Sequence, residues 1–142
     1  MYLALKTKSD NGLFQRLFYW LTKWRLLTEY PHAGIVYDGL LYHSNLANGL
    51  HAVTFNPEGW VMVEVPDTHG VADLFELFRG TDYDWFSLLG FVLPWQVRDG
   101  DRMYCYEWCW LAMTGEVHPG RVTPEMLLAI AHSLKTTKED HA

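Results

Sequence analysis

Cysteine is scarce in this 142-residue sequence, which has only Cys105 and Cys109. Two cysteines in a chain of this size argue against a scaffold held by disulfides and favour a role in chemistry or packing. The sequence also has no glycine-rich phosphate loop, internal repeat or low-complexity segment. These absences argue against a phosphate-loop nucleotide site, a repeat protein and a disordered linker.

Long uncharged apolar runs are missing as well. The most apolar helical stretch, residues 13–27, is too short for a membrane span and contains Arg16, Lys23 and Arg25. The first residues have no signal-peptide apolar region followed by a small-residue cleavage site. We therefore expect no transmembrane segment, and a cytoplasmic or virion-associated protein.

Positive charge is in short supply beyond the N-terminal region. Residues 1–25 carry a net charge of +4, whereas the remaining residues carry −10. A mostly acidic body argues against a nucleic-acid partner. The basic N-terminal region can meet an anionic surface, although the sequence favours a solvated helix face there.

Apolar and aromatic residues, in contrast, are plentiful, at 49% and 15% of the chain. This composition predicts one folded domain over residues 1–142, with a frayed polar tail at 135–142. Alternation and turn residues predict strands at 2–6, 32–37, 40–45, 49–55 and 60–65, with the last joined to its predecessor as an antiparallel meander. Helical spacing and capping residues predict helices at 13–27, 67–79, 85–93 and 104–113 and another from 124. The fold class is therefore α+β, an antiparallel sheet packed against helices.

The most informative stretch is residues 30–45, Tyr-Pro-His-Ala-Gly-Ile-Val-Tyr-Asp-Gly-Leu-Leu-Tyr-His-Ser-Asn. Asp38-Gly39 between two β-rich runs predicts a two-residue hairpin turn. In that register Gly34 faces His43 and His32 faces Asn45. Side chains alternate along a strand, so the two histidines share one face around the glycine, close enough for their rings to meet.

Cys105 is expected in the first turn of a helix. Free amide groups and the helix dipole at that position favour a thiolate and should lower the pKa of the thiol. A nearby imidazole would act as a base, and a third group would orient that imidazole. His32 is the candidate base and His43 the candidate orienting residue, with Asn45 as an alternative. Cys109, one turn further on between two tryptophans, is interpreted as a core residue.

The order of these motifs adds to that interpretation. His-Ala-Gly-Ile-Val-Tyr at 32–37, His43, and Tyr-Cys-Tyr-Glu-Trp at 104–108 resemble the circularly permuted NlpC-like cysteine hydrolases, the YiiX-like and lecithin:retinol acyltransferase-like branch of the papain-like superfamily. The Tyr-Asp-Trp-Phe stretch at 83–86 is similar to a segment that precedes the cysteine helix in this group. The resemblance covers residues 30–128. It implies a permuted papain-like fold, Cys105 as nucleophile, His32 as general base and His43 as third catalytic residue.

The sequence departs from that pattern at two places. Tyr106 stands where serine is usual after the nucleophile, and Pro31 precedes the histidine where a small polar residue is expected. Tyr106 puts the substrate class in doubt more than the catalysis. Glu107 matches the motif's glutamate, but it lies about 200° around the helix from Cys105 and is expected to brace the helix.

Other ligand and function classes remain open on the sequence. Cys105, Cys109, His32 and His43 have the residue types of a zinc site, but Cys-x-x-x-Cys is not the usual spacing, so we expect no metal and no cofactor. The favoured function is hydrolysis of an amide bond by the thiol, with the Cys105 backbone N–H in the oxyanion hole. The resemblance implies a cell-wall (peptidoglycan) peptide as substrate, in a phage or prophage context. The alternatives are a lipid acyl hydrolase or acyltransferase, and a catalytically inactive module that binds a peptide or a sugar. The oligomeric state is left open.

Overall fold

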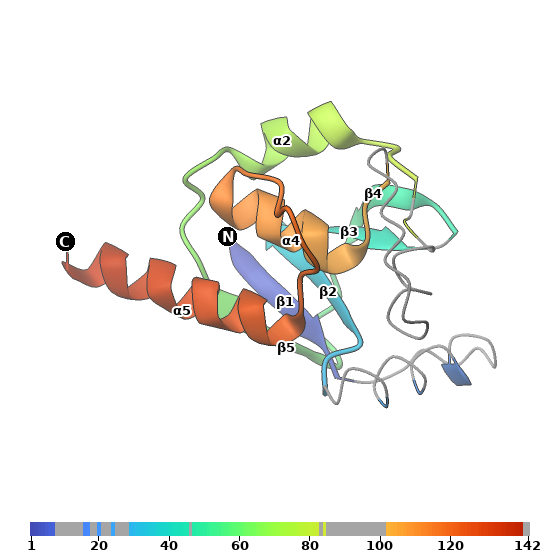
Figure 1. The fold of residues 1–142 in the computed structure, drawn as a ribbon, viewed down its shortest axis with the longest axis horizontal. Coiled ribbons are helices and arrows are strands. Elements are labelled where there is room, and N and C mark those ends of the chain that lie inside the picture. The colour runs from blue at the N-terminus through green and yellow to red at the C-terminus, as the bar shows by residue number, and fades with distance from the viewer. Residues whose placement is uncertain are drawn as a thin grey trace.

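The computed structural model of the protein describes residues 1–7, 16, 17, 20, 24, 29–45, 47–82, 84 and 102–140. The helix predicted at 85–93 and most of the one predicted at 13–27 lie outside the described residues. The described part is α+β: a five-stranded antiparallel sheet and three helices, as predicted. Figure 1 shows the helices grouped on one side of the sheet.

The strands run in the order β4-β3-β2-β1-β5 across the sheet. Their bounds are β1 Tyr2–Lys6, β2 His32–Tyr37, β3 Leu40–Asn45, β4 Gly49–Thr54 and β5 Trp60–Glu64. The Asp38-Gly39 hairpin is confirmed, because both residues have positive φ, 48° and 75° and Tyr37 pairs with Leu40. Positive φ at both central positions is what a type I′ turn requires.

The predicted meander is correct from β2 to β4 and wrong for β5. That strand crosses to the far edge of the sheet and pairs with β1, where Leu3 lies opposite Val63. Leu3 and Leu5 are fully buried. β1 lies between β2 and β5 and pairs with both of them. Its backbone groups therefore have partners on both edges, as a buried strand requires.

The three helices are α2 Val71–Phe78, α4 Cys105–Thr114 and α5 Pro124–Asp140. The predicted helix ends are close to the observed ones. Asp67 accepts a hydrogen bond of 2.9 Å from the first backbone amide of α2. Gly115 ends α4 with φ 75°, a conformation that glycine adopts without steric cost. Thr123 caps the start of α5 through its hydroxyl oxygen.

The frayed tail predicted from residue 135 is not observed over 135–140, where α5 continues to Asp140. The Thr136 and Thr137 hydroxyls donate to carbonyls one turn earlier, those of His132 and Ser133. These two hydroxyls are therefore satisfied within the helix.

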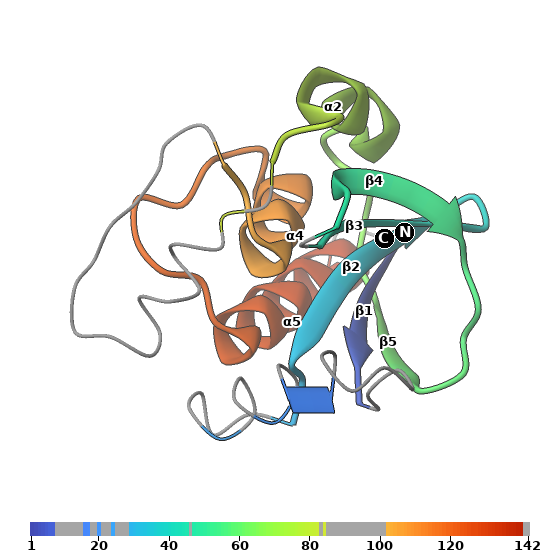
Figure 2. The ribbon, with the colours of Figure 1, turned by 90° about the vertical axis from the view of Figure 1, so that its right-hand side faces the viewer.

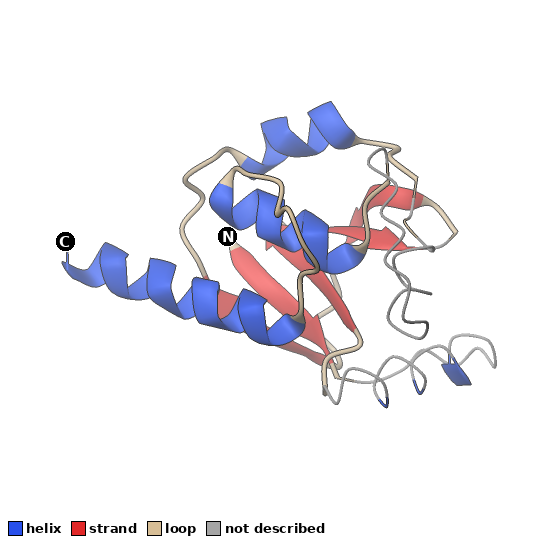
Figure 3. Cartoon of the chain, in the orientation of Figure 1, coloured by secondary structure: helices blue, strands red, loops and turns tan. Residues whose placement is uncertain are grey.

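The helices cover one face of the sheet, which we call the helix face (Figure 2). α4 lies over β2 and β3, while α5 lies beside it and over β5, and α2 contacts α4. The cartoon coloured by secondary structure shows the same two layers (Figure 3). The main core lies between them and includes Leu3, Ile35, Tyr42 and most of α4. Val71 and Phe75 of α2 contribute to this core.

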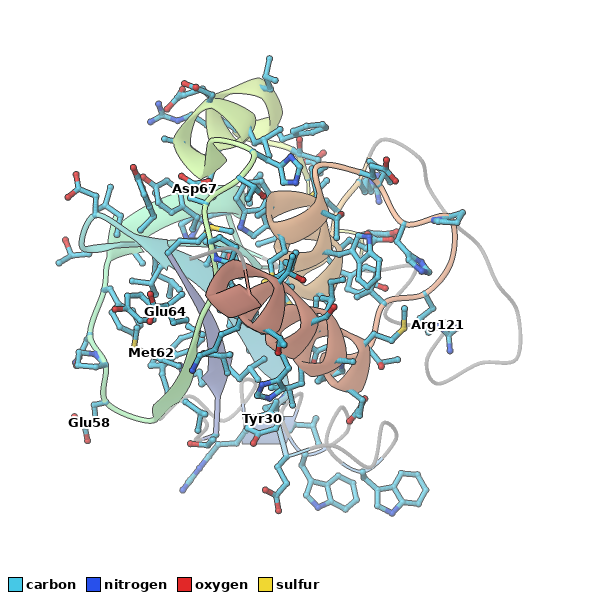
Figure 4. The ribbon with its side chains drawn as sticks, turned by 90° about the vertical axis from the view of Figure 1, so that its left-hand side faces the viewer. Tyr30, Glu58, Met62, Glu64, Asp67 and Arg121 are labelled. Atoms are coloured by element: carbon cyan, nitrogen blue, oxygen red, sulfur yellow. The ribbon has the colours of Figure 1, made fainter. Side chains whose placement is uncertain are left out.

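The opposite side of the sheet, the outer face, has a smaller apolar cluster. Ala4, Val36 and Leu41 form it, and Phe55 and Trp60 pack against it. Met62 lies opposite Ala4 in the register and is labelled on β5 in Figure 4, together with Glu64. No helix among the described residues is both long and apolar enough to cross a membrane.

Candidate active site

His32 and His43 meet on the outer face of the sheet. The His32 Nε2 and His43 Nδ1 atoms are 2.8 Å apart, a hydrogen-bonding distance. Their ring centroids are 5.1 Å apart in a T-shaped arrangement. The prediction that these two side chains share a face is therefore confirmed.

Gly34 lies between the two histidines and leaves room for the side chains of Leu41 and His43. A Cβ atom at this position would lie 2.6 Å from Leu41 Cδ1 and 3.1 Å from His43 Cβ. Both distances are shorter than ordinary carbon–carbon contacts. Glycine is therefore the residue that fits between the two imidazoles.

The strands that carry the histidines separate at this end. The β2–β3 ladder pairs Ile35, Val36 and Tyr37 with residues 40–42 and goes no further. The predicted pairing of Gly34 with His43 and of His32 with Asn45 is therefore not part of the observed ladder. Hydrogen bonds from the region of α4 take the place of the missing strand pairs.

Two of these hydrogen bonds connect the start of α4 to β3. Trp108 Nε1 donates to the Tyr42 carbonyl at 2.9 Å, and the Ser44 hydroxyl donates to the Met103 carbonyl at 2.7 Å. Ser44 and Trp108 are fully buried. Buried polar groups bonded in this way fix the position of the helix, since losing a partner would leave a desolvated group. The start of α4 is thus held where β2 and β3 diverge.

Cys105 lies at this helix start and contacts β2. The backbone amides of Ala33, the residue after His32, and of Tyr106 are close enough to its sulfur to favour the thiolate. Cys105 is 3% exposed. Burial raises the pKa of the Cys105 thiol to about 12, outweighing the backbone hydrogen bonds that lower it.

The expectation of a lowered thiol pKa at Cys105 is therefore wrong for this structure. Backbone amides at a helix start favour a thiolate by a modest amount, whereas removing the sulfur from water penalises its charged form more strongly. The resting group is a neutral thiol.

His32 is also uncharged near neutral pH. Its pKa is lowered from 6.5 to about 4, first by burial and then by the positive charges of Lys6 and His51. Lys6 lies directly opposite His32 in the sheet, and its ammonium group is 5.4 Å from the ring centroid of Trp60. The ring of His32 also contacts Trp60, with centroids 5.9 Å apart.

These contacts place the thiol and the imidazole pair on different sides of β2. His32 contacts Trp60 of the outer face, whereas Ala33 and Cys105 belong to the core on the helix face. The structure brings His32 together with His43 and packs Cys105, at the start of α4, with Ala33, the next residue of the strand that carries His32. A direct contact between the thiol and His32 stays a prediction.

His51, which the sequence pattern did not assign to the site, joins this cluster. It pairs directly with His43 across β3 and β4, and their ring centroids are 4.4 Å apart. His51 Nδ1 lies 2.9 Å from the Gly49 carbonyl oxygen, so Nδ1 carries the proton and donates. Extending the strand register from β3 to β4 would have revealed this third imidazole, because His51 lies directly opposite His43.

Asn45 does not take the orienting role that was its alternative assignment. Its amide nitrogen lies 3.4 Å from His51 Nε2. Its side-chain oxygen accepts hydrogen bonds from the backbone amides of Ala47 and Asn48. Asn45 therefore shapes the β3–β4 turn, and His43 is the residue bonded to His32.

The remaining residues of the cysteine motif have structural partners. The Tyr106 hydroxyl donates to the Tyr30 carbonyl at 2.6 Å, which anchors the chain just before β2. Glu107 accepts a hydrogen bond from the Tyr104 amide at 3.3 Å and so braces the helix start, as expected. Cys109 is fully buried, and burial raises the pKa of its thiol.

Among the described residues, no group of three or more histidine, cysteine, aspartate or glutamate side chains is arranged to hold a metal ion. The zinc arrangement considered for Cys105, Cys109, His32 and His43 is therefore not formed. No protein-family model matches the chain, and no similarity to a curated protein or to a solved structure was found.

Proposed function

We propose that this protein is a thiol-dependent hydrolase of peptide-type amide bonds, with a circularly permuted papain-like fold. The observation that carries the proposal is the 2.8 Å contact between His32 Nε2 and His43 Nδ1, with a helix-start cysteine whose thiolate is favoured by the backbone amide of Ala33, the residue after His32. A helix-start thiol that packs against the strand of a paired imidazole supplies the residue types that nucleophilic cysteine catalysis uses, and the mechanism requires His32 to reach this thiol from the other side of β2. The order of the motifs, which resembles the permuted NlpC-like hydrolases, gives further support.

The two nitrogens of His32 have distinct roles in this proposal. In the proposed tautomer the N–H at Nε2 donates a hydrogen bond to His43 Nδ1. This bond holds the His32 ring in one tautomer and one orientation. Nδ1 is then the atom that takes the thiol proton. His43 is a positioning residue, because it acts on the substrate only through His32.

The reaction follows from these roles. The mechanism requires the His32 ring to come within reach of the thiol, and the Cys105 proton then moves to His32 Nδ1 as the sulfur attacks the amide carbonyl and a carbon–sulfur bond forms. The carbon–nitrogen bond then breaks, and His32 returns the proton to the leaving amine. Water attacks the thioester in a second step and regenerates the thiol. The backbone N–H of Cys105, the first residue of α4, is a donor for the oxyanion.

Activation requires a change in the surroundings of the thiol. The pKa of Cys105 is raised to about 12 and that of His32 is lowered to about 4, so the resting pair is neutral. Both shifts have burial as their largest cause. A substrate that opens the site to solvent, or that places its carbonyl beside the sulfur, brings the two pKa values closer together. The substrate class that the resemblance implies is a cell-wall peptide.

A binding module without catalysis is the second candidate function. The observation that favours it is the burial of the Cys105 thiol, which is 3% exposed and neutral. In this alternative the buried thiol only fills the core, and the outer face around His32 contacts a peptide or a sugar.

Covalent trapping distinguishes the two candidates. The purified protein is incubated with peptide-amide substrates and with a peptide carrying a thiol-reactive electrophile, and the adduct is mapped by mass spectrometry. We expect modification at Cys105 and turnover that is abolished in Cys105→Ser. Cys109→Ser is the matched control, since that thiol is also buried, and it should retain turnover.

The histidine variants test the assigned roles. His32→Gln should lower turnover roughly 10²- to 10⁴-fold, the usual effect of removing a general base. Turnover that survives in Cys105→Ser would refute the thiol mechanism. Peptide binding by isothermal titration calorimetry without any adduct at Cys105 would support the binding module.

A further inference from the structure

Three apolar side chains of the N-terminal region are exposed to solvent. Leu17, Trp20 and Trp24 are 55%, 60% and 66% exposed, and each lies in helical conformation. Their spacing of three and four residues places them on one side of a helix. The indoles of Trp20 and Trp24 stack with centroids 6.2 Å apart and planes 6° apart. We call these three side chains the indole face.

The charge around the indole face is opposite in sign to that of the remaining molecule. Residues 16–25 include Arg16, Lys23 and Arg25 and no acidic residue. Arg16 is exposed, next to Leu17. Residues beyond 25 carry −10 in total. An anionic surface therefore attracts this segment and repels the acidic body, which orients the molecule with the indole face toward that surface.

We propose that the indole face binds the surface of an anionic lipid bilayer, with both indoles at the level of the headgroups. Tryptophan is the side chain that prefers this interface, because its apolar ring and polar N–H suit the boundary between acyl chains and water. Basic residues on the same segment add attraction to anionic headgroups. A second copy of this chain is a poorer occupant, since two identical basic segments would repel each other. This inference is independent of the proposed hydrolase activity.

Vesicle co-sedimentation with the full chain tests the proposal. The vesicles contain phosphatidylcholine alone or phosphatidylcholine mixed with phosphatidylglycerol. We expect binding to the anionic vesicles, with affinity that falls as salt is raised, because the surface attraction is screened. Trp20→Ala with Trp24→Ala should weaken this binding roughly tenfold or more, through loss of buried apolar area. Reversing Arg16, Lys23 and Arg25 to glutamate should weaken it by at least a similar factor.

Leu77→Ala provides the matched control. Leu77 is an apolar side chain on α2 that is 78% exposed, so its removal tests whether any exposed apolar residue contributes. This variant should bind the anionic vesicles as the wild type does. Unchanged circular dichroism of the tryptophan variant, whose replaced side chains are exposed, shows that the fold is intact.

Two outcomes would overturn the proposal. In one, the wild type sediments no more with anionic vesicles than with phosphatidylcholine alone. In the other, the tryptophan double variant sediments as the wild type does. A change of sedimentation coefficient between the wild type and that variant without lipid, together with unchanged vesicle binding, would assign the face to self-association instead.

Discussion

Acidification from about pH 7 to about pH 4 should destabilise the wild-type protein more than it destabilises His32→Gln. The His32 imidazole is half-buried between β1 and β3. The groups around it are Lys6 on β1, His43 on β3 and His51 on β4. Two of these, Lys6 and His51, disfavour an added positive charge at this place.

The sign of the effect follows from the direction of the pKa shift. The pKa of His32 is lowered from 6.5 to about 4 in the folded protein, with burial as the largest cause. Folding therefore favours the neutral ring. The corresponding stability is fully present above pH 6.5 and is lost as the pH falls from 6.5 through 4. At about 1.4 kcal/mol for each pKa unit, the loss near pH 4 is about 3 kcal/mol.

Urea unfolding of the wild type and of His32→Gln at both pH values measures this loss. Glutamine keeps a nitrogen donor near the position of Nε2 and does not titrate in this range. We expect the free energy of unfolding to fall by about 3 kcal/mol more in the wild type than in the variant. His132→Gln, at an exposed position of α5, should fall as the wild type does. An equal fall in the wild type and in His32→Gln would refute the argument.

Three further predictions concern single contacts, each checked by urea unfolding. Gly49→Ala should destabilise the protein by roughly 3 kcal/mol or more. A Cβ atom there would overlap the Thr81 carbonyl, and the φ of 62° disfavours alanine. An unchanged free energy of unfolding in this variant would contradict the close contact. Ser44→Ala should cost about 1–3 kcal/mol by leaving the buried Met103 carbonyl without this donor, and Ser44→Thr, which keeps the hydroxyl, should lose less if the core accepts the methyl group. Asp67→Ala should cost about 1 kcal/mol by removing the acceptor at the start of α2, whereas Asp67→Asn should retain most of the stability.

The sequence alone determined the local elements of this protein. Asp38-Gly39 specified a tight hairpin because both residues tolerate positive φ, which 48° and 75° confirm. Gly115 marked the end of α4 and Thr123-Pro124 the start of α5 for similarly local reasons. Strand alternation then placed His32 and His43 on one face, because that property needs only the hairpin register. These features depend on residues within a few positions of one another.

The position of β5 and the chemistry of the thiol depended on residues far apart in the chain. β5 pairs with β1 and not with β4, because β1 carries the fully buried Leu3 and Leu5 and needs a second partner for its backbone edge. No local pattern identifies that partner. The short β2–β3 ladder is likewise set by α4, whose Trp108 bonds the Tyr42 carbonyl.

The pKa of Cys105 depends both on its local sequence and on contacts with distant residues. Its place at a helix start could be predicted from nearby residues, and this place alone favours a thiolate. β2 and the core around α4 bury it. The thiol is therefore desolvated in part by residues more than sixty positions away in the sequence. Desolvation penalises a charge more than a few backbone amides stabilise it. The sequence therefore located the thiol, and the tertiary structure decided its protonation state.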